Sequence, residues 1–191
     1  GRGKRALTSG KGYSGANFSA DASYFIQSYS DVNTPPVYRM KKTKDTTTVR
    51  VLLNNTKLKE TLAEFKLPVK EFSTININGE ELNLWMIKPN DFDPNKKYPL
   101  LMFQYSGPGS QEVTNRWSDE RTLWHKSIAN KGYIIACVDG RGTGFKGAAF
   151  KKATYMNLAK LEAIDQIDSA RKLGELPFVD AKRIGIWGWS F

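Results

Sequence analysis

The chain has 191 residues, of which 40% are hydrophobic and 25% charged, which is the composition of a folded globular protein. Five Trp, eight Tyr and ten Phe exclude a disordered segment, and the absence of any apolar run of about 18 residues argues against a transmembrane helix. The net charge of +10 is spread along the chain without a groove-reading motif, so we expect no nucleic-acid partner.

The start of the sequence and its single cysteine give further expectations. The first residues contain neither an initiator Met nor a signal peptide, so we expect the natural N-terminus to lie upstream. A single cysteine, Cys137, excludes an internal disulfide. It lies in the apolar run 133–138, which predicts a small buried hydrophobe rather than a reactive thiol.

Residues 1–53 have the pattern of an all-β region. Large aromatic and small polar residues alternate over 23–30, and further short strands are predicted at 37–40 and 48–53, with a turn over 31–36. Short strands at close spacing are typical of a sandwich or a propeller blade. Three such strands are not stable alone, so we interpret this region as the end of a larger β-domain.

Residues 54–67 change character and predict a helix. Asn55 and Thr56 are suited to cap its start, and Pro68 ends it. The apolar side chains that share one face of this helix are Leu58, Leu62 and Phe65. We interpret it as a linker between two domains.

From Phe72 onward the pattern is that of an α/β domain. Asn78-Gly79 between two alternating runs predicts a β-hairpin. Further strands are expected at 98–105, 133–138 and 184–187, and helices at 122–131 and 158–173. The buried face expected for the last helix consists of Leu161, Ile164, Ile167, Ala170 and Leu173. Alternation of strand and helix predicts a mostly parallel sheet with helices on its faces, and its last strand is expected to be buried.

Ser190 is the candidate nucleophile. Gly188-x-Ser190 directly after a short apolar strand supplies the first three positions of the G-x-S-x-G nucleophile elbow, a strand-to-helix turn that exposes a serine hydroxyl. Such a hydroxyl needs a neighbouring base to become reactive. The alternative interpretation is a helix N-cap serine, whose local sequence is similar. His125, the only histidine, precedes the serine, whereas the α/β-hydrolase order places histidine last, so we expect a structural or surface role for it.

Other polar residues stand at predicted strand ends. Tyr105 opens a Gly-Pro-Gly loop, where a phenol can donate a hydrogen bond to a developing oxyanion; the alternative is an ordinary aromatic at a strand end. Asp139 and Arg141 follow the next strand, and we expect them to pair and shape that loop. The alternating glycines around them do not satisfy G-x-G-x-x-G, and no His–Cys cluster has metal spacing, so no cofactor and no metal are expected.

These segments, in this order, resemble the prolyl oligopeptidase family of serine peptidases, and within it the dipeptidyl peptidase IV branch. The motifs that carry the resemblance are 98–101, 105–108, 139–144, Asp165-Gln166 and 178–190. In the β-rich start, 7–10 and 18–21 are similar to the closing blade of that family's propeller.

The resemblance implies a fold, a chemistry and site residues. Residues 1–53 would be the C-terminal part of a β-propeller, and 54–191 the first part of an α/β-hydrolase domain. Ser190 would be the nucleophile, with the Tyr105 hydroxyl and the backbone N–H of Phe191 forming the oxyanion hole. Position 191 is often Tyr in the family, but Phe keeps the backbone donor. Trp189 is a candidate substrate-binding residue.

The activity implied is release of N-terminal dipeptides with Pro or Ala in second position, by a homodimer in an extracytoplasmic location. The catalytic Asp and His, most of the proline pocket and the glutamates that grip the substrate amine would lie outside this sequence. An oligopeptidase, an acylaminoacyl peptidase or a catalytically silent peptide-binding relative therefore stay open. We expect the 191-residue piece alone to be inactive and prone to aggregate.

Overall fold

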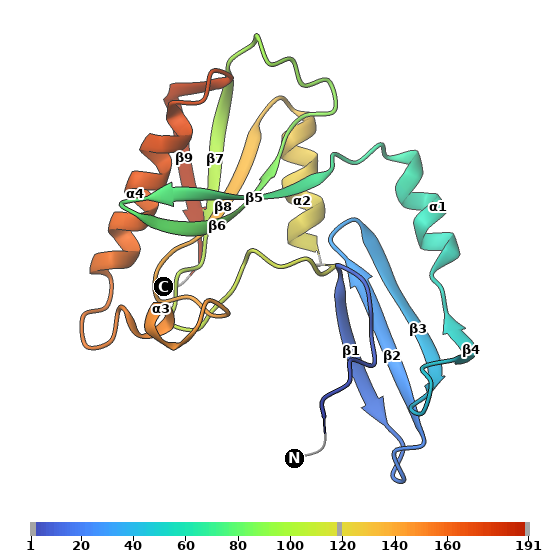
Figure 1. Cartoon of the computed structure of the whole chain (residues 1–191). Helices are drawn as coiled ribbons and strands as arrows, with labels where there is room; N and C mark the ends of the chain where they lie inside the picture. The colour runs from blue at the N-terminus through green and yellow to red at the C-terminus, as the bar shows by residue number, and fades with distance from the viewer. Residues whose placement is uncertain (1–2, 118–119, 190–191) are drawn as a thin grey trace. The chain divides into compact units, whose positions relative to one another are not determined.

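The computed structural model describes residues 3–117 and 120–189, without the side chain of Glu120 (Figure 1). The chain divides into two compact units, each with a sheet of its own. The first comprises residues up to Lys66 together with 115–119, and the second comprises 67–114 and the residues from Glu120 onward.

The first unit is built on a four-stranded antiparallel sheet in the order β1-β2-β3-β4, followed by one helix. The elements are β1 (Tyr13–Phe18), β2 (Tyr24–Asp31), β3 (Thr34–Lys42), β4 (Thr48–Leu53) and α1 (Thr56–Glu64). The strand predicted over 48–53 is confirmed, and so is the alternating strand, whose Phe25 is 1% exposed while Ile26 is 40% exposed.

The turn predicted over 31–36 is confirmed, but it is shorter than predicted. β3 already begins at Thr34, which is opposite Asp31, so the loop is only Val32 and Asn33. The Asn33 N–H donates to the Asp31 carboxylate at 2.9 Å, which supports this tight turn. Two prolines then lie within the strand, where the register between β2 and β3 shifts. Prolines are tolerated at such irregularities because no ladder hydrogen bond is required of them there.

α1 lies where a helix was predicted, but Asn55 does not cap it through its side chain. The Asn55 amide instead donates to the Pro36 carbonyl at 2.7 Å, and the Thr56 N–H is bonded to the Asn54 side chain at 3.1 Å. No residue within the helix is buried, and Leu58 on the predicted apolar face is 40% exposed. The interpretation of this helix as a linker stays a prediction.

The second unit contains a five-stranded mixed sheet in the order β5-β6-β8-β7-β9. Its strands are β5 (Lys70–Ile77), β6 (Glu80–Ile87), β7 (Tyr98–Gln104), β8 (Ile134–Asp139) and β9 (Val179–Gly188). Its helices are α2 (Glu120–Asn130), α3 (Ala148–Lys152) and α4 (Lys160–Gly174). The expectation of a mostly parallel sheet is corrected, because β7 is parallel to both β8 and β9 whereas β6 is antiparallel to β5 and β8.

The hairpin of β5 and β6 is confirmed at its turn. Ile77 is opposite Glu80, so Asn78 and Gly79 alone form the loop, with φ of 52° and 86°. Positive φ at both positions is the type I′ geometry that matches the strand twist, and it explains why Asn-Gly occurs here.

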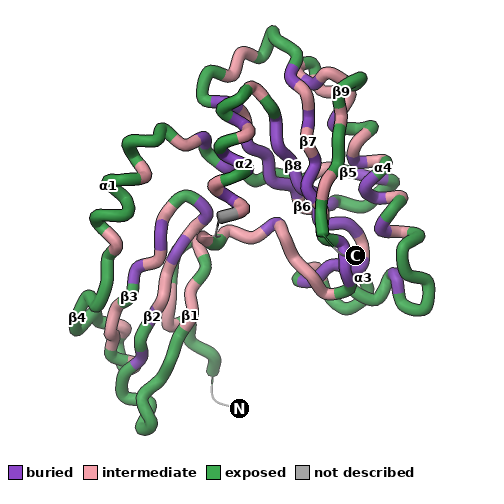
Figure 2. Tube along the Cα trace, turned by 180° about the vertical axis from the view of Figure 1, so that it is seen from behind, coloured by how far each residue is buried: buried purple, intermediate pink, exposed green. Residues whose placement is uncertain are grey.

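Alternate side chains of the sheet form two cores, one on each face. Leu84, Met86 and Ile184 belong to the core that includes Leu173 of α4. The intervening Trp85 and Trp187 belong to the core on the α2 side. α4 and α2 therefore cover opposite faces. β8 is buried over its whole length, as Figure 2 shows, because it is covered on both faces and paired at both edges.

Two burial expectations for this unit are wrong. On α4 the predicted apolar face is confirmed at Leu173 but wrong at Ile167, which is 51% exposed. The buried residues of the helix are Glu162, Asp165, Gln166, Ser169 and Leu173. β9 was expected to be buried, but within the described residues it pairs only with β7 and forms the sheet edge, where Ile186 is 56% exposed.

Candidate active site

The carboxyl ends of β7 and β9 meet at the edge where the sequence predicts catalysis. Gln104 and Gly188, the last residues of these strands, are opposite each other in the parallel ladder. A Cβ on Gly188 would lie 2.2 Å from the Gln104 carbonyl oxygen, so this close approach of the two backbones requires glycine. Tyr105 and Trp189, the next residues of each strand, consequently start from the same edge of the sheet.

Tyr105 opens a loop that hydrogen bonds hold in place. Its carbonyl accepts a hydrogen bond from the Ser110 hydroxyl at 3.0 Å. The Gly109 N–H donates to the Gly142 carbonyl at 2.9 Å and the Gly144 N–H to the Ser110 carbonyl at 2.8 Å, so the loops after β7 and β8 are joined. The Tyr105 side chain is 36% exposed. A solvent-accessible phenol on a loop that is fixed by hydrogen bonds is suited to donate a hydrogen bond to a bound molecule.

Two of the sequence-predicted site residues, Ser190 and Phe191, lie outside the described residues. Their roles as nucleophile and oxyanion donor therefore stay predictions. Trp189, the candidate substrate-binding residue, is 84% exposed directly after β9.

Asp139 does not pair with Arg141, and that expectation is wrong. The Asp139 carboxylate accepts the backbone N–H groups of Glu112 and Val113 at 3.0 and 2.9 Å. It thus fixes the second half of the loop that Tyr105 opens. Burial raises the pKa of Asp139 to about 6, against the lowering effect of these two hydrogen bonds.

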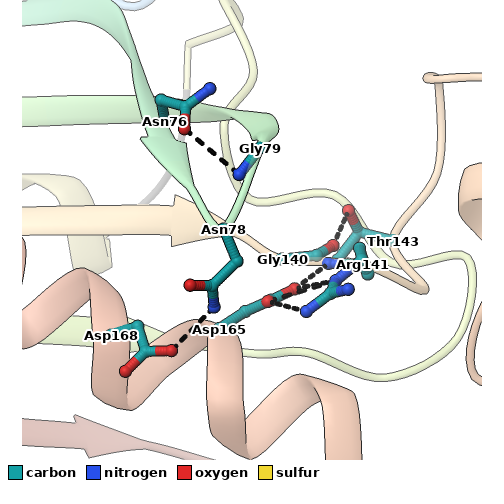
Figure 3. A network of polar contacts seen from close by, with 8 residues as sticks. All are labelled: Asn76, Asn78, Gly79, Gly140, Arg141, Thr143, Asp165 and Asp168. Carbon is teal, nitrogen blue, oxygen red and sulfur yellow. Dashed lines mark hydrogen bonds and ion pairs between the residues drawn. The ribbon is translucent and has the colours of Figure 1, made fainter.

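Arg141 instead pairs with Asp165 on α4. The guanidinium donates to the Asp165 carboxylate at 2.7 Å, and the Arg141 backbone N–H donates to the same carboxylate at 2.7 Å (Figure 3). Asp165 is fully buried, so the carboxylate is neutralised where water cannot reach it. A second contact, from the Asn78 amide to Asp168 at 2.8 Å, joins the β5–β6 turn to the same helix (Figure 3).

Sequence reasoning missed the buried polar face of α4, because the one available signal, the spacing of its polar residues, does not show whether they are buried. The four polar residues Glu162, Asp165, Gln166 and Ser169 recur at spacings of three and four, which is the period of one helix face. A polar stripe of this kind is usually solvated, and only the partners on distant loops reveal that it is buried.

His125 is a buried structural residue, as expected. It is 2% exposed and contacts four aromatic rings. These rings belong to Trp85, Phe103, Trp124 and Trp187. Burial and nearby cations lower its pKa to about 3, so the imidazole is neutral. The expected burial of Cys137 is also confirmed: it is 1% exposed, and burial raises the pKa of its thiol well above the ordinary value.

Two kinds of feature are absent from the described parts of the chain. Within residues 3–117 and 120–189, no group of three or more His, Cys, Asp or Glu side chains is placed to hold a metal ion. No helix in the same segments has the length and apolar character that crossing a membrane requires.

Comparison with known proteins points to one family. Residues 120–191 match the prolyl oligopeptidase family. A probable dipeptidyl peptidase 4 of Aspergillus flavus is 40% identical over 181 residues, which cover 94% of this chain and 23% of that protein. A probable dipeptidyl-aminopeptidase B of Emericella nidulans is 38% identical over 96% of this chain and 20% of its own length. The chain is therefore similar to members of the prolyl oligopeptidase family along nearly its whole length.

Solved structures of dipeptidyl peptidases extend the likeness to the fold. The crystal structure of Porphyromonas gingivalis dipeptidyl peptidase 4 matches with a TM-score of 0.91 and 46% identity, covering 96% of this chain and 26% of that chain. A putative dipeptidyl aminopeptidase IV from Bacteroides ovatus matches with a TM-score of 0.81 and 33% identity, covering 93% of this chain and 25% of that chain. The chain therefore spans between a fifth and about a quarter of the length of these relatives.

Proposed function

We propose that the full-length protein is a serine peptidase that releases N-terminal dipeptides of the form Xaa-Pro or Xaa-Ala through an acyl-enzyme. The match of residues 120–191 to the prolyl oligopeptidase family supports a peptidase, and the names of the relatives support dipeptidyl specificity. The observation that carries the proposal is the pairing of Gln104 with Gly188, which brings the chain leading to Ser190 to the edge where Tyr105 begins.

The proposed reaction uses few groups of this chain. Ser190 attacks the scissile carbonyl while a histidine from the rest of the protein takes its proton. The histidine gives this proton to the leaving amine as the peptide C–N bond breaks, and water then hydrolyses the acyl-enzyme and frees Ser190. The Tyr105 hydroxyl and the Phe191 backbone N–H donate hydrogen bonds to the oxyanion, because charge develops on that oxygen in the transition state. Trp189 contributes to substrate binding. No cofactor takes part in this reaction.

The proposal includes a domain organisation. Residues 1–53 would be the last part of a β-propeller, which the four-stranded antiparallel sheet supports because a propeller blade is a sheet of that size. Residues 54–191 would be the first part of an α/β-hydrolase domain that reaches the nucleophile elbow. A homodimer in an extracytoplasmic location follows from the same family likeness and is proposed with it.

A substrate comparison on the full-length protein tests the proposal. We expect hydrolysis of Gly-Pro-anilide and no hydrolysis of the same dipeptide anilide with a blocked amino group. Preference for the blocked substrate would instead assign an oligopeptidase or acylaminoacyl peptidase. Hydrolysis of neither substrate by a folded protein would assign a catalytically silent relative.

A further inference from the structure

A cavity on the α4 side of the sheet lies next to the proposed site. It has a volume of about 310 Å³ and is bounded by α4, by β9 and by the end of β7. Gln104 and Ser106 line it from the β7 side, Ile186 from β9, and Glu162 and Gln166 from α4. The cavity therefore reaches the strand ends from which Tyr105 and Trp189 start.

The cavity contains hydrogen-bond acceptors that lack donors. Glu162 is 3% exposed, and neither of its carboxylate oxygens has a hydrogen-bond partner among the described residues. The Oε1 of Gln166 is likewise unpartnered within that part of the chain, although its Nε2 donates to the Val138 carbonyl at 2.9 Å. Burying such acceptors without donors costs about 1–3 kcal/mol each, and more for a charged group. One carboxylate and one amide oxygen are too few for a Ca²⁺ or Mg²⁺ site, so the missing partner is a group with N–H or O–H donors.

The topology identifies which segment supplies these donors. From β7 to β8 the chain crosses by α2 on one face, and from β8 to β9 it crosses β7 in the opposite direction by α4 on the other face. Crossovers between parallel strands are right-handed, so a connection that runs across the sheet in the opposite direction lies on the opposite face. A further parallel strand beyond β9 in the full-length protein would continue in the direction of the second crossover, so its connection would also run on the α4 face. That face of β9 is the one on which Ile186 is 56% exposed.

We propose that Glu162 is a positioning residue for the nucleophile. This inference rests on the proposed function. In the full-length protein, the segment after Phe191 forms the helix of the nucleophile elbow and occupies the cavity beside Ile186. The first N–H groups of a helix lack partners within it and favour a nearby anion. The Glu162 carboxylate accepts hydrogen bonds from that first turn, and Gln166 accepts another. Glu162 thereby fixes the turn that holds Ser190.

The test uses the full-length protein and the variant Glu162→Gln, which keeps the shape of the side chain but removes its charge and one acceptor. We expect amide hydrogen exchange in the ten residues or so after position 191 to accelerate by about tenfold or more, because a hydrogen bond to a charged acceptor is lost. We also expect Ser190 labelling by a fluorophosphonate, and kcat for Gly-Pro-anilide, to fall by about tenfold per folded active site, with KM within about threefold.

The matched control is Glu175→Gln, the same change at the other end of α4, where the carboxylate is 65% exposed. It should alter neither exchange nor labelling. Unchanged exchange after position 191 in Glu162→Gln overturns the inference, whatever the activity, and faster exchange with unchanged labelling overturns the positioning role. Absence of labelling in the wild-type protein would count against the proposed function instead. If Glu162→Gln does not fold, a structure of the full-length wild-type protein decides, because a Glu162 carboxylate bonded only to water or to residues before 190 overturns the inference.

Discussion

At the residue scale, Tyr105 gives the most direct prediction about chemistry. Replacing Tyr105 by Phe in the full-length protein removes one proposed oxyanion donor and leaves the ring. Loss of such a donor costs about 2.7–4 kcal/mol of barrier, so kcat for Gly-Pro-anilide should fall roughly 100- to 1000-fold. Steady-state kinetics measure the effect. A decrease of less than about threefold would remove Tyr105 from the oxyanion hole.

His125 gives a prediction about the pH dependence of stability. Its pKa is about 3 in the folded protein, against about 6.5 for an exposed imidazole. The neutral imidazole therefore stabilises the fold above pH 6.5, and this contribution is lost at about 1.4 kcal/mol per pH unit as the pH falls from there toward 3. His125→Phe keeps an aromatic ring in the cluster. In the full-length protein it should reduce the decrease of the unfolding free energy as the pH falls below about 6.5, which urea denaturation measures.

Asp139 changes the stability with pH in the direction opposite to His125, so it serves as the comparison. Its pKa is raised to about 6 from 3.8, so the folded state binds a proton more readily, and this contribution to stability grows as the pH falls from 6 toward 4. Asp139→Asn should therefore make the unfolding free energy decrease more steeply with falling pH, whereas His125→Phe should make it decrease less steeply. The same dependence of the unfolding free energy on acid pH in both variants would contradict the pKa shifts assigned to His125 and Asp139.

At the element scale, the pair that joins the loop after β8 to α4 can be tested against a surface pair of the same helix. Arg141→Ala leaves the fully buried Asp165 carboxylate without its cation, and breaking a buried pair in this way costs about 3–5 kcal/mol of unfolding free energy. Arg171→Ala removes the pairing of Asp168 with a 75% exposed side chain and should cost about 1 kcal/mol or less. Chemical denaturation of both variants in the full-length protein measures the difference, and equal losses would contradict the structural role of Asp165.

The elements differ in how far the sequence determines them. The Asn78-Gly79 turn and the apolar run of β8 were predictable, because turn chemistry and continuous burial are local signals. The buried face of α4 was not, since the partner of Asp165 is 24 residues away on another loop. The exposed Ile186 likewise could not be predicted, because an apolar strand does not reveal whether it lies at the centre or the edge of its sheet.

The candidate site was predictable to a different degree at each position. Gly188 could be chosen from the elbow pattern, and the structure gives the physical reason in the contact with the Gln104 carbonyl. Tyr105 could be chosen from its place at a strand end. Glu162 could not, because nothing in its local sequence distinguishes a buried carboxylate from a solvated one.

At the scale of the whole molecule, the isolated 191-residue chain should behave differently from the full-length protein. β9 is an edge strand among the described residues, and Trp189, Ile186 and Phe65 expose apolar surface. Exposed edges and apolar faces favour association, so we expect light scattering to detect aggregates. The chain should also lack peptidase activity, because the proposed general base is not within it. A monomer that unfolds cooperatively, or one that hydrolyses Gly-Pro-anilide, would contradict this prediction.

The central claim is that Ser190 is the nucleophile of a dipeptidyl peptidase, and the most direct test is to identify the residue that becomes acylated. Full-length protein treated with a fluorophosphonate and digested should carry the label on Ser190 in mass spectrometry, and Ser190→Ala should lower kcat for Gly-Pro-anilide by about 10⁵- to 10⁶-fold. A label on another serine, together with Ser190→Ala activity close to that of the wild type, would contradict it.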